Sequence, residues 1–161
     1  MQTILTFALA VLLAVNAVGS TKALFAPIAA GLHESGVPVL LPGSLPKDDM
    51  QGLRAELRSA NAGGYEIELD YAADCNGATA CHLGTISGAR SSGTKPGGKA
   101  VHLANGMTGY YLAGGCGASC SDSSITFDRA GNRYVFAAKG ASLEYLSQWT
   151  ASIEALSAQS R

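Results

Sequence analysis

The chain has 161 residues, 11 Lys and Arg against 12 Asp and Glu, and a mean hydropathy of +0.17. A nucleic-acid binder normally shows a clear basic excess, so the near balance of charge argues against that class. After the N-terminus no apolar stretch approaches the ~20 residues that a membrane-spanning helix needs, which excludes a membrane-embedded mature domain.

The N-terminus predicts an export signal. The apolar run from Ile4 to Val18 is too short to span a bilayer. Small residues follow it and place a cleavage site within residues 17–23. We therefore expect residues 1–23 to be a signal peptide and the mature protein to be secreted or periplasmic. The alternative is a retained N-terminal anchor.

Residues 24–46 carry four of the five prolines: Pro27, Pro38, Pro42 and Pro46. Proline has no backbone N–H to donate to a strand ladder, so this stretch predicts an extended or edge-lying segment. Its apolar part, Val37–Pro42, is expected to pack on a single disulfide-linked domain formed by residues 47–161.

A short N-terminal helix is predicted over Lys47–Ala60. An aspartate is available there as N-cap, and apolar residues follow at helical spacing. These residues are Asp48 or Asp49 as the cap, and Met50, Leu53 and Leu57 as the apolar positions.

Six strands are predicted after this helix from alternating polarity and turn residues. They cover residues 65–71, 82–89, 99–103, 108–113, 124–128 and 133–139. In the first strand Glu66, Glu68 and Asp70 share one face. Carboxylates at this spacing suit an acid–base pair or a calcium-binding strip. The strict alternation favours a solvated outer face instead.

A C-terminal helix is predicted over Ser142–Ala158, with Ser142 as its cap and an apolar stripe that lays Trp149 onto the sheet. The expected fold class is therefore α+β. It is an antiparallel sheet of about six strands in hairpins, covered on one face by this helix.

The four cysteines lie in two close pairs, Cys75 with Cys81 and Cys116 with Cys120. An even number of cysteines in an exported chain predicts disulfides, and three pairings are open. The loops are rich in small residues that permit tight bends, which favours the local pairing. The C-x5-C and C-x3-C spacings fit neither a zinc knuckle nor a redox C-x2-C motif. Neither a metal nor a cofactor is expected.

No motif of an enzyme is complete. Ser92 and Lys95 match Ser-x-x-Lys, but the glycines and proline of the Arg90–Gly98 loop exclude the helix that this mechanism needs. His82 and His102, if they lay on neighbouring strands, would form a metal or acid–base site. Nothing supplies a third ligand at fixed spacing, so ordinary sheet histidines are preferred.

The Tyr110–Tyr111 pair indicates a recognition surface. Neighbouring strand residues point to opposite faces, so one tyrosine is exposed if the other borders the core. Tyrosine anchors contacts at low entropic cost, and Lys95 and Lys99 lie in the loop and strand nearby. The alternative is a tyrosine at the core margin with its hydroxyl in water.

Three functions follow, in order of preference. The first is an exported, non-catalytic binding module for a protein or small ligand of the cell envelope. The second is a carrier or sensor of an apolar ligand held between sheet and helix. That layout is similar in outline to the periplasmic lipoprotein-carrier fold, by fold analogy alone. The third is a small hydrolase using His82 or His102. A deep apolar cavity beside Trp149 favours the carrier, and a filled core favours the surface binder.

Overall fold

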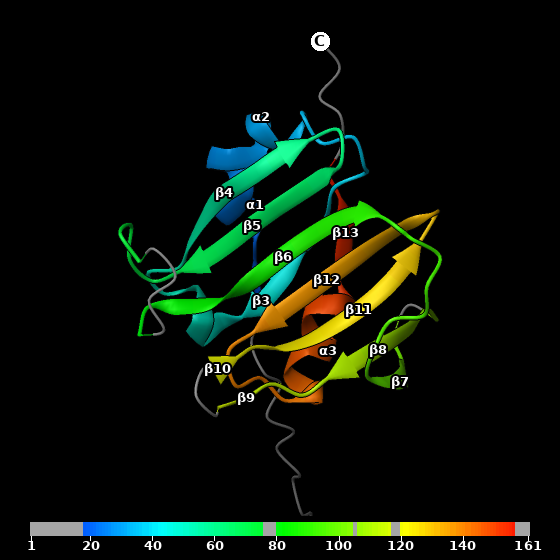
Figure 1. The fold of residues 1–161 in the computed structure, drawn as a ribbon. Helices are drawn as coiled ribbons and strands as arrows, with labels where there is room; N and C mark the ends of the chain where they lie inside the picture. Colours follow the sequence, from blue (N-terminus) through cyan, green and yellow to red (C-terminus); the bar gives the residue numbers. More distant parts are fainter. Residues whose placement is uncertain (1–17, 76–79, 105, 117–119, 157–161) are drawn as a thin grey trace, which may run out of the picture.

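A computed structural model describes residues 18–75, 80–104, 106–116 and 120–156. Residues 1–17 of the predicted signal peptide, which covers residues 1–23, lie outside this range. The described residues form a seven-stranded antiparallel sheet in the order β4-β5-β6-β12-β11-β8-β7 (Figure 1). Its strands are β4 (Arg54–Asn61), β5 (Gly64–Asp70), β6 (His82–Arg90), β7 (Lys99–His102), β8 (Thr108–Leu112), β11 (Ser123–Arg129) and β12 (Asn132–Ala138).

The six predicted strands are present, and the additional strand is β4. The helix predicted over Lys47–Ala60 was wrong, because only Lys47–Met50 forms a 3-10 turn (η2). Residues 54–61 pair instead along β5, and Leu57 faces Ile67 in the register. This long pairing with β5 outweighs the weak helical spacing of the apolar residues.

Turn chemistry explains two of the hairpins. Between β11 and β12, Ala130 and Gly131 have φ of 50° and 76°. A two-residue turn with positive φ at both positions matches the twist of antiparallel strands. The predicted β7–β8 hairpin is present; Gly106 in its turn has a φ of 79°, and Lys99 lies opposite Tyr111 and His102 opposite Thr108.

The helix α3 (Leu143–Ala151) covers one face of the sheet, behind β11 and β12 in Figure 1. Ser142 caps it, since its side chain accepts a hydrogen bond from the Tyr145 amide at 3.2 Å. The predicted end at Ala158 was wrong. The chain leaves the helix after Ala151 and forms β13 (Ile153–Ala155), which pairs with β2 (Leu40–Pro42).

The proline-rich segment is extended only in part. It begins with three short helical pieces, α1 (Lys22–Phe25), η1 (Ala26–Ile28) and α2 (Ala29–Leu32). All three contact β4. Pro27 stands at the start of η1, where a missing N–H costs nothing. Two short strands, β2 and β3 (Ser44–Pro46), follow, and β3 pairs with β1 (Val18–Ser20). As predicted, Val37–Leu41 pack on the domain, where most of their apolar side chains are buried.

The space between α3 and the sheet is filled by large side chains. Trp149 and Leu146 are fully buried, and the Phe127 ring packs 5.4 Å from Tyr134 and 5.5 Å from Phe136, centroid to centroid. The helix and these buried side chains lie on one side of the sheet. We call the side facing away from α3 the open face; no described helix lies over it in Figure 1.

No helix of the described chain has the length and apolar character needed to cross a bilayer. The remaining two-stranded sheet joins β9 (Gly115–Cys116) to β10 (Cys120–Ser121), with Cys116 opposite Cys120.

Candidate functional site

The local disulfide pairing is confirmed. Cys75 and Cys81 are joined with a Cα–Cα distance of 5.7 Å, and Cys116 and Cys120 with 4.1 Å. The first bond closes the connection from β5 to β6, and the second closes the turn between β9 and β10. All four thiols are consumed, so neither pair offers a free thiolate to a metal or to a redox reaction.

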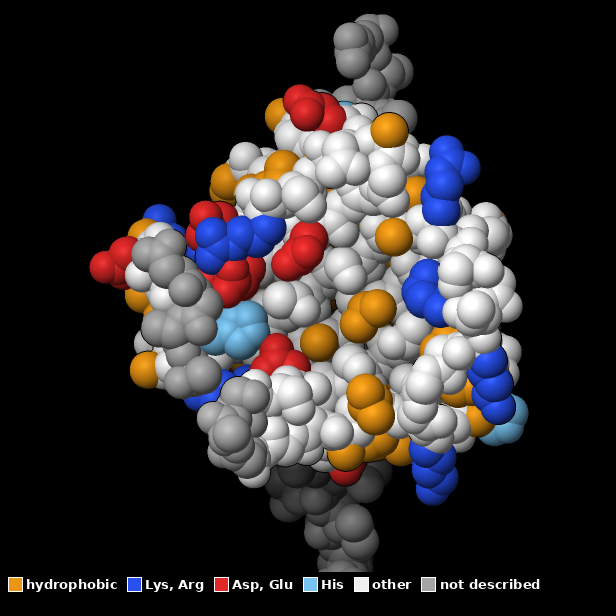
Figure 2. Space-filling view, in the orientation of Figure 1, with side chains coloured by type: hydrophobic (Ala, Val, Ile, Leu, Met, Phe, Trp, Pro, Cys, Tyr) orange, Lys and Arg blue, Asp and Glu red, His pale blue; other side chains and the backbone are white. Residues whose placement is uncertain are grey.

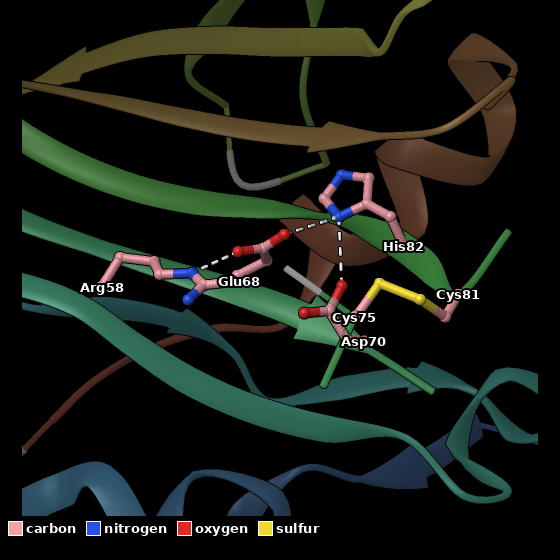
Figure 3. The surroundings of a disulfide bond; sticks show 6 residues. All are labelled: Arg58, Glu68, Asp70, Cys75, Cys81 and His82. Carbon is pink, nitrogen blue, oxygen red and sulfur yellow. Dashed lines mark hydrogen bonds and ion pairs between the residues drawn. A yellow bond between two sulfur atoms is a disulfide. The ribbon is translucent and has the colours of Figure 1, made fainter. Parts of the chain in front are cut away.

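Beside the first disulfide, a histidine lies among three carboxylates, of which Figure 3 shows Glu68 and Asp70. Asp70 and His82 face each other in the β5–β6 register. The Nδ1 atom of His82 lies 3.2 Å from Asp70 Oδ1 and 3.3 Å from Glu68 Oε1. The other ring nitrogen, Nε2, lies 3.0 Å from Oδ2 of Asp122, which follows β10. We call these residues, together with Arg58, the His82 cluster.

The prediction that Glu66, Glu68 and Asp70 form a solvated face was wrong for Glu68 and Asp70. They do point away from the core, but only 8% of Glu68 and 2% of Asp70 is exposed, whereas Glu66 is exposed. Arg58 covers Glu68 and donates its Nε–H to Glu68 Oε2. A register shift between Leu57 and Ser59 accompanies this contact, as β-bulges re-aim a side chain.

The electrostatics of the cluster follow from its burial. Burial by itself lowers the pKa of His82, but the hydrogen bonds to Asp122 and Asp70 outweigh it and raise the pKa above its usual value. Burial raises the pKa of Asp70, and the hydrogen bond with His82 offsets only part of this rise. Oxygen Oδ2 of Asp70 is buried and has no hydrogen-bond partner among the described residues.

His102 does not join this cluster. It lies on β7 at one edge of the sheet, and β12, β11 and β8 separate it from His82 on β6. The two histidines that the hydrolase hypothesis pairs are therefore far apart in the sheet.

The four predicted binding residues divide between the two faces of the sheet. Tyr110 pairs with Thr126 on the open face, and Lys95 lies over its ring, with Nζ 5.6 Å from the ring centroid. Tyr111 pairs with the buried Ile125 on the covered face, and its hydroxyl donates to the Ala141 carbonyl at 3.1 Å.

Lys99 lies opposite Tyr111 at the sheet edge and is exposed. The structure thus brings Lys95 together with Tyr110, and Lys99 together with Tyr111.

Contacts with β11 and β12 hold the predicted loop between β6 and β7. Ser91 donates to Asp128 Oδ2 at 3.2 Å, and the Arg133 guanidinium donates to the Thr94 carbonyl. Arg133 also binds Asp128, with Nε 2.8 Å from Oδ1. These contacts place Lys95 over Tyr110 although the loop has no regular structure.

Charge is distributed unevenly over the open face. Figure 2 shows acidic side chains and a histidine gathered over the β4–β6 side, with basic side chains among them, and further Lys and Arg side chains along the β7–β8 side. The basic residues between the start of β6 and the end of β12 are Arg90, Lys95, Lys99, Arg129 and Arg133. The face therefore presents two electrostatically different ends.

A cavity of about 450 Å³ lies between α1 and the β2–β13 pair, lined by residues that include Phe25, Leu41 and Leu156. It is not the space beside Trp149 that the carrier hypothesis requires.

With the fold and these contacts established, comparisons supply no relative: no family model matches the chain, and no match is found among curated proteins or solved structures.

Sequence reasoning missed the His82 cluster, although the signal was present. Cys81 directly precedes His82, and Cys75 follows Asp70 by five positions. A disulfide that closes the β5–β6 connection brings Asp70 and His82 face to face. Asp122 follows Cys120 in the same way, so the cysteines mark the two loops that assemble the cluster.

Proposed function

We propose that the chain is an exported, non-catalytic binding module that contacts an acidic partner with the β7–β8 side of its open face. The contact surface consists of Lys95, Tyr110 and Leu112. Lys99 is exposed on the edge strand β7 next to it, on the side of Tyr111. The observation that carries the proposal is the stacking of Lys95 on Tyr110, with Nζ 5.6 Å from the ring centroid.

This surface combines uncompensated positive charge with apolar area. Lys95 and Lys99 are exposed and form no ion pair within the described part of the chain. Leu112 is 55% exposed, and Tyr110 is partly exposed beside it. The tyrosine ring stabilises a complex because its apolar area is buried against the partner. The positive charge of the neighbouring lysines favours acidic partners and speeds their association.

The filled core favours surface binding over the carrier hypothesis. Trp149, Leu146 and Phe136 are fully buried between helix and sheet. An apolar ligand at that place would have to displace close-packed side chains.

Two features support export. The N-terminal run from Ile4 to Val18 has the length of a signal-peptide core. Two disulfides in so short a chain are typical of proteins that work in an oxidising compartment.

A charge-reversal experiment tests the proposal. Fluorescence anisotropy of a labelled oligoglutamate peptide, titrated with the oxidised protein at low ionic strength, should show saturable binding that weakens with salt. Lys95→Glu should weaken the binding several-fold, because it reverses the charge at the centre of the surface.

Lys47→Glu is the matched control, since Lys47 is also exposed but lies on η2. Equal loss in both variants, or equally tight binding of an oligolysine peptide, would refute the proposed surface.

A further inference from the structure

The His82 cluster brings one imidazole and two carboxylates together. We propose that Glu68, Asp70 and His82 bind one divalent transition-metal ion through Oε1, Oδ1 and Nδ1. The three atoms lie within 4.8 Å of one another at the end of β5 and the start of β6.

The distances between these atoms fit a shared ion. Nδ1 of His82 is 3.2 Å from Asp70 Oδ1 and 3.3 Å from Glu68 Oε1. Metal bonds of about 2.0–2.2 Å place neighbouring ligands of one ion roughly 3.0–3.5 Å apart in octahedral or tetrahedral geometry. Figure 3 shows both carboxylates converging on the same ring nitrogen.

A hydrogen atom on Nδ1 of His82 cannot form good hydrogen bonds with both carboxylates at once. Nδ1 carries at most one N–H, and two carboxylates face it. Asp70 is 2% exposed, and its Oδ2 has no hydrogen-bond partner among the described residues. Such a buried, unpaired oxygen is costly. A cation accepts both carboxylates at once, and its charge also stabilises the unpaired Oδ2 of the same Asp70 carboxylate.

The residues that contact the proposed ligands are also those expected around a metal-bound histidine. A ligating imidazole usually donates its other N–H to a carboxylate, which fixes the tautomer and turns the free nitrogen to the ion. Nε2 of His82 lies 3.0 Å from Asp122 Oδ2. Arg58 holds the second oxygen of Glu68, as an outer partner orients a ligating carboxylate.

The donor set selects the class of ion. Calcium and magnesium take oxygen ligands, whereas one imidazole with two carboxylates suits zinc and its neighbours in the first transition series. Three protein ligands leave positions for water. The 14% exposure of the His82 side chain gives an ion access from the open face.

Isothermal titration calorimetry with zinc tests the site. The tag-free, oxidised full chain, stripped with EDTA, should bind one Zn²⁺ more tightly than Ca²⁺. Glu68→Gln and His82→Gln should each weaken zinc binding by at least roughly tenfold, the scale on which even outer contacts of a metal site act. Circular dichroism checks that both variants fold.

Matched controls lie nearby in the chain. Glu66→Gln makes the same change two residues away on the same face of β5, and His102→Gln removes a histidine outside the cluster. Both should leave zinc affinity unchanged.

X-ray absorption of the zinc-loaded wild type gives an independent readout and should show a single imidazole among oxygen ligands. Absence of saturable zinc binding, equal losses in the controls, or a spectrum without imidazole would overturn the proposal.

Discussion

The Nε2 atom of His82 lies 3.0 Å from Oδ2 of Asp122, so two segments forty residues apart meet at one imidazole. The contact joins the start of β6 to the segment between β10 and β11, although β12 lies between β6 and β11 in the sheet. It links the surroundings of the two disulfides through a single polar group.

Burial lowers the pKa of His82, and this contact raises it. The hydrogen bond to Asp122 is the largest of the contributions that raise this pKa. Asp122→Asn should therefore lower the pKa of His82, measured by NMR titration of the imidazole nitrogens in EDTA. Asp128→Asn, which does not touch the ring, should leave it unchanged. An unchanged pKa in Asp122→Asn would contradict the assigned contact.

The Arg133–Asp128 pair predicts a stability difference that depends on pH. The hydrogen bond from Arg133 lowers the pKa of Asp128 in the folded protein. A lowered folded pKa gives stability that is present above the unfolded value of about 3.9 and is lost as pH falls through the folded pKa.

Asp128→Asn should thus be less stable than wild type at pH 7, by less than about 1 kcal/mol because the pair is partly exposed. The difference should shrink towards zero as the pH falls below the folded pKa, measured by urea unfolding. Asp48→Asn, at an exposed side chain, is the control. A difference that persists at the lowest pH would count against the ion pair as its source.

The two disulfides should contribute unequally. Loop entropy assigns about 2 kcal/mol to either short loop. Cys75 is 4% exposed and supports the His82 cluster, whereas Cys116 and Cys120 are exposed. Urea unfolding should therefore show a larger loss for Cys75→Ser with Cys81→Ser than for the Cys116→Ser, Cys120→Ser variant. The reverse order would show that the β9–β10 turn has the larger role.

Truncation of Trp149 tests the filled core. This side chain is fully buried, and Trp149→Ala should cost about 3–5 kcal/mol in unfolding free energy. Leu112→Ala, at a site that is 55% exposed, should change stability by less than about 0.5 kcal/mol. A small loss for Trp149→Ala would mean that the space beside it is not close-packed, as a carrier requires.

The strands that the sequence predicts share strong alternation or a clear turn. Residues 65–70 alternate large apolar and acidic side chains, and Asn132 and Gly131 stand at a tight turn. The edge strand β4 was missed because its inner face carries only Ala55, Leu57 and Ala60, with a register shift between them that breaks the alternation, and Leu57 also fits helical spacing with Leu53. Pairing with β5 decides its structure, and that is a tertiary effect.

The candidate sites were predictable to different degrees. Tyr110 and Lys95 were singled out by residue type, whereas the contacts of their loop with Asp128 and Arg133 that bring them together were not predicted. Alternation also places Glu68 and Asp70 on the outer side of β5. Their burial depends on Arg58 from a bulge in β4 and on His82 across β6, and no periodicity along one strand contains that information.

Site-specific photocrosslinking in the native host tests the proposed function most directly. A photoreactive amino acid at Tyr110 should crosslink the mature protein to a partner through an acidic segment, identified by mass spectrometry. Lys95→Glu should reduce the yield of that crosslink several-fold, and the same probe at Glu66, at the other end of the open face, should not produce it. A crosslink that forms equally from both positions, or that survives Lys95→Glu, would contradict the account.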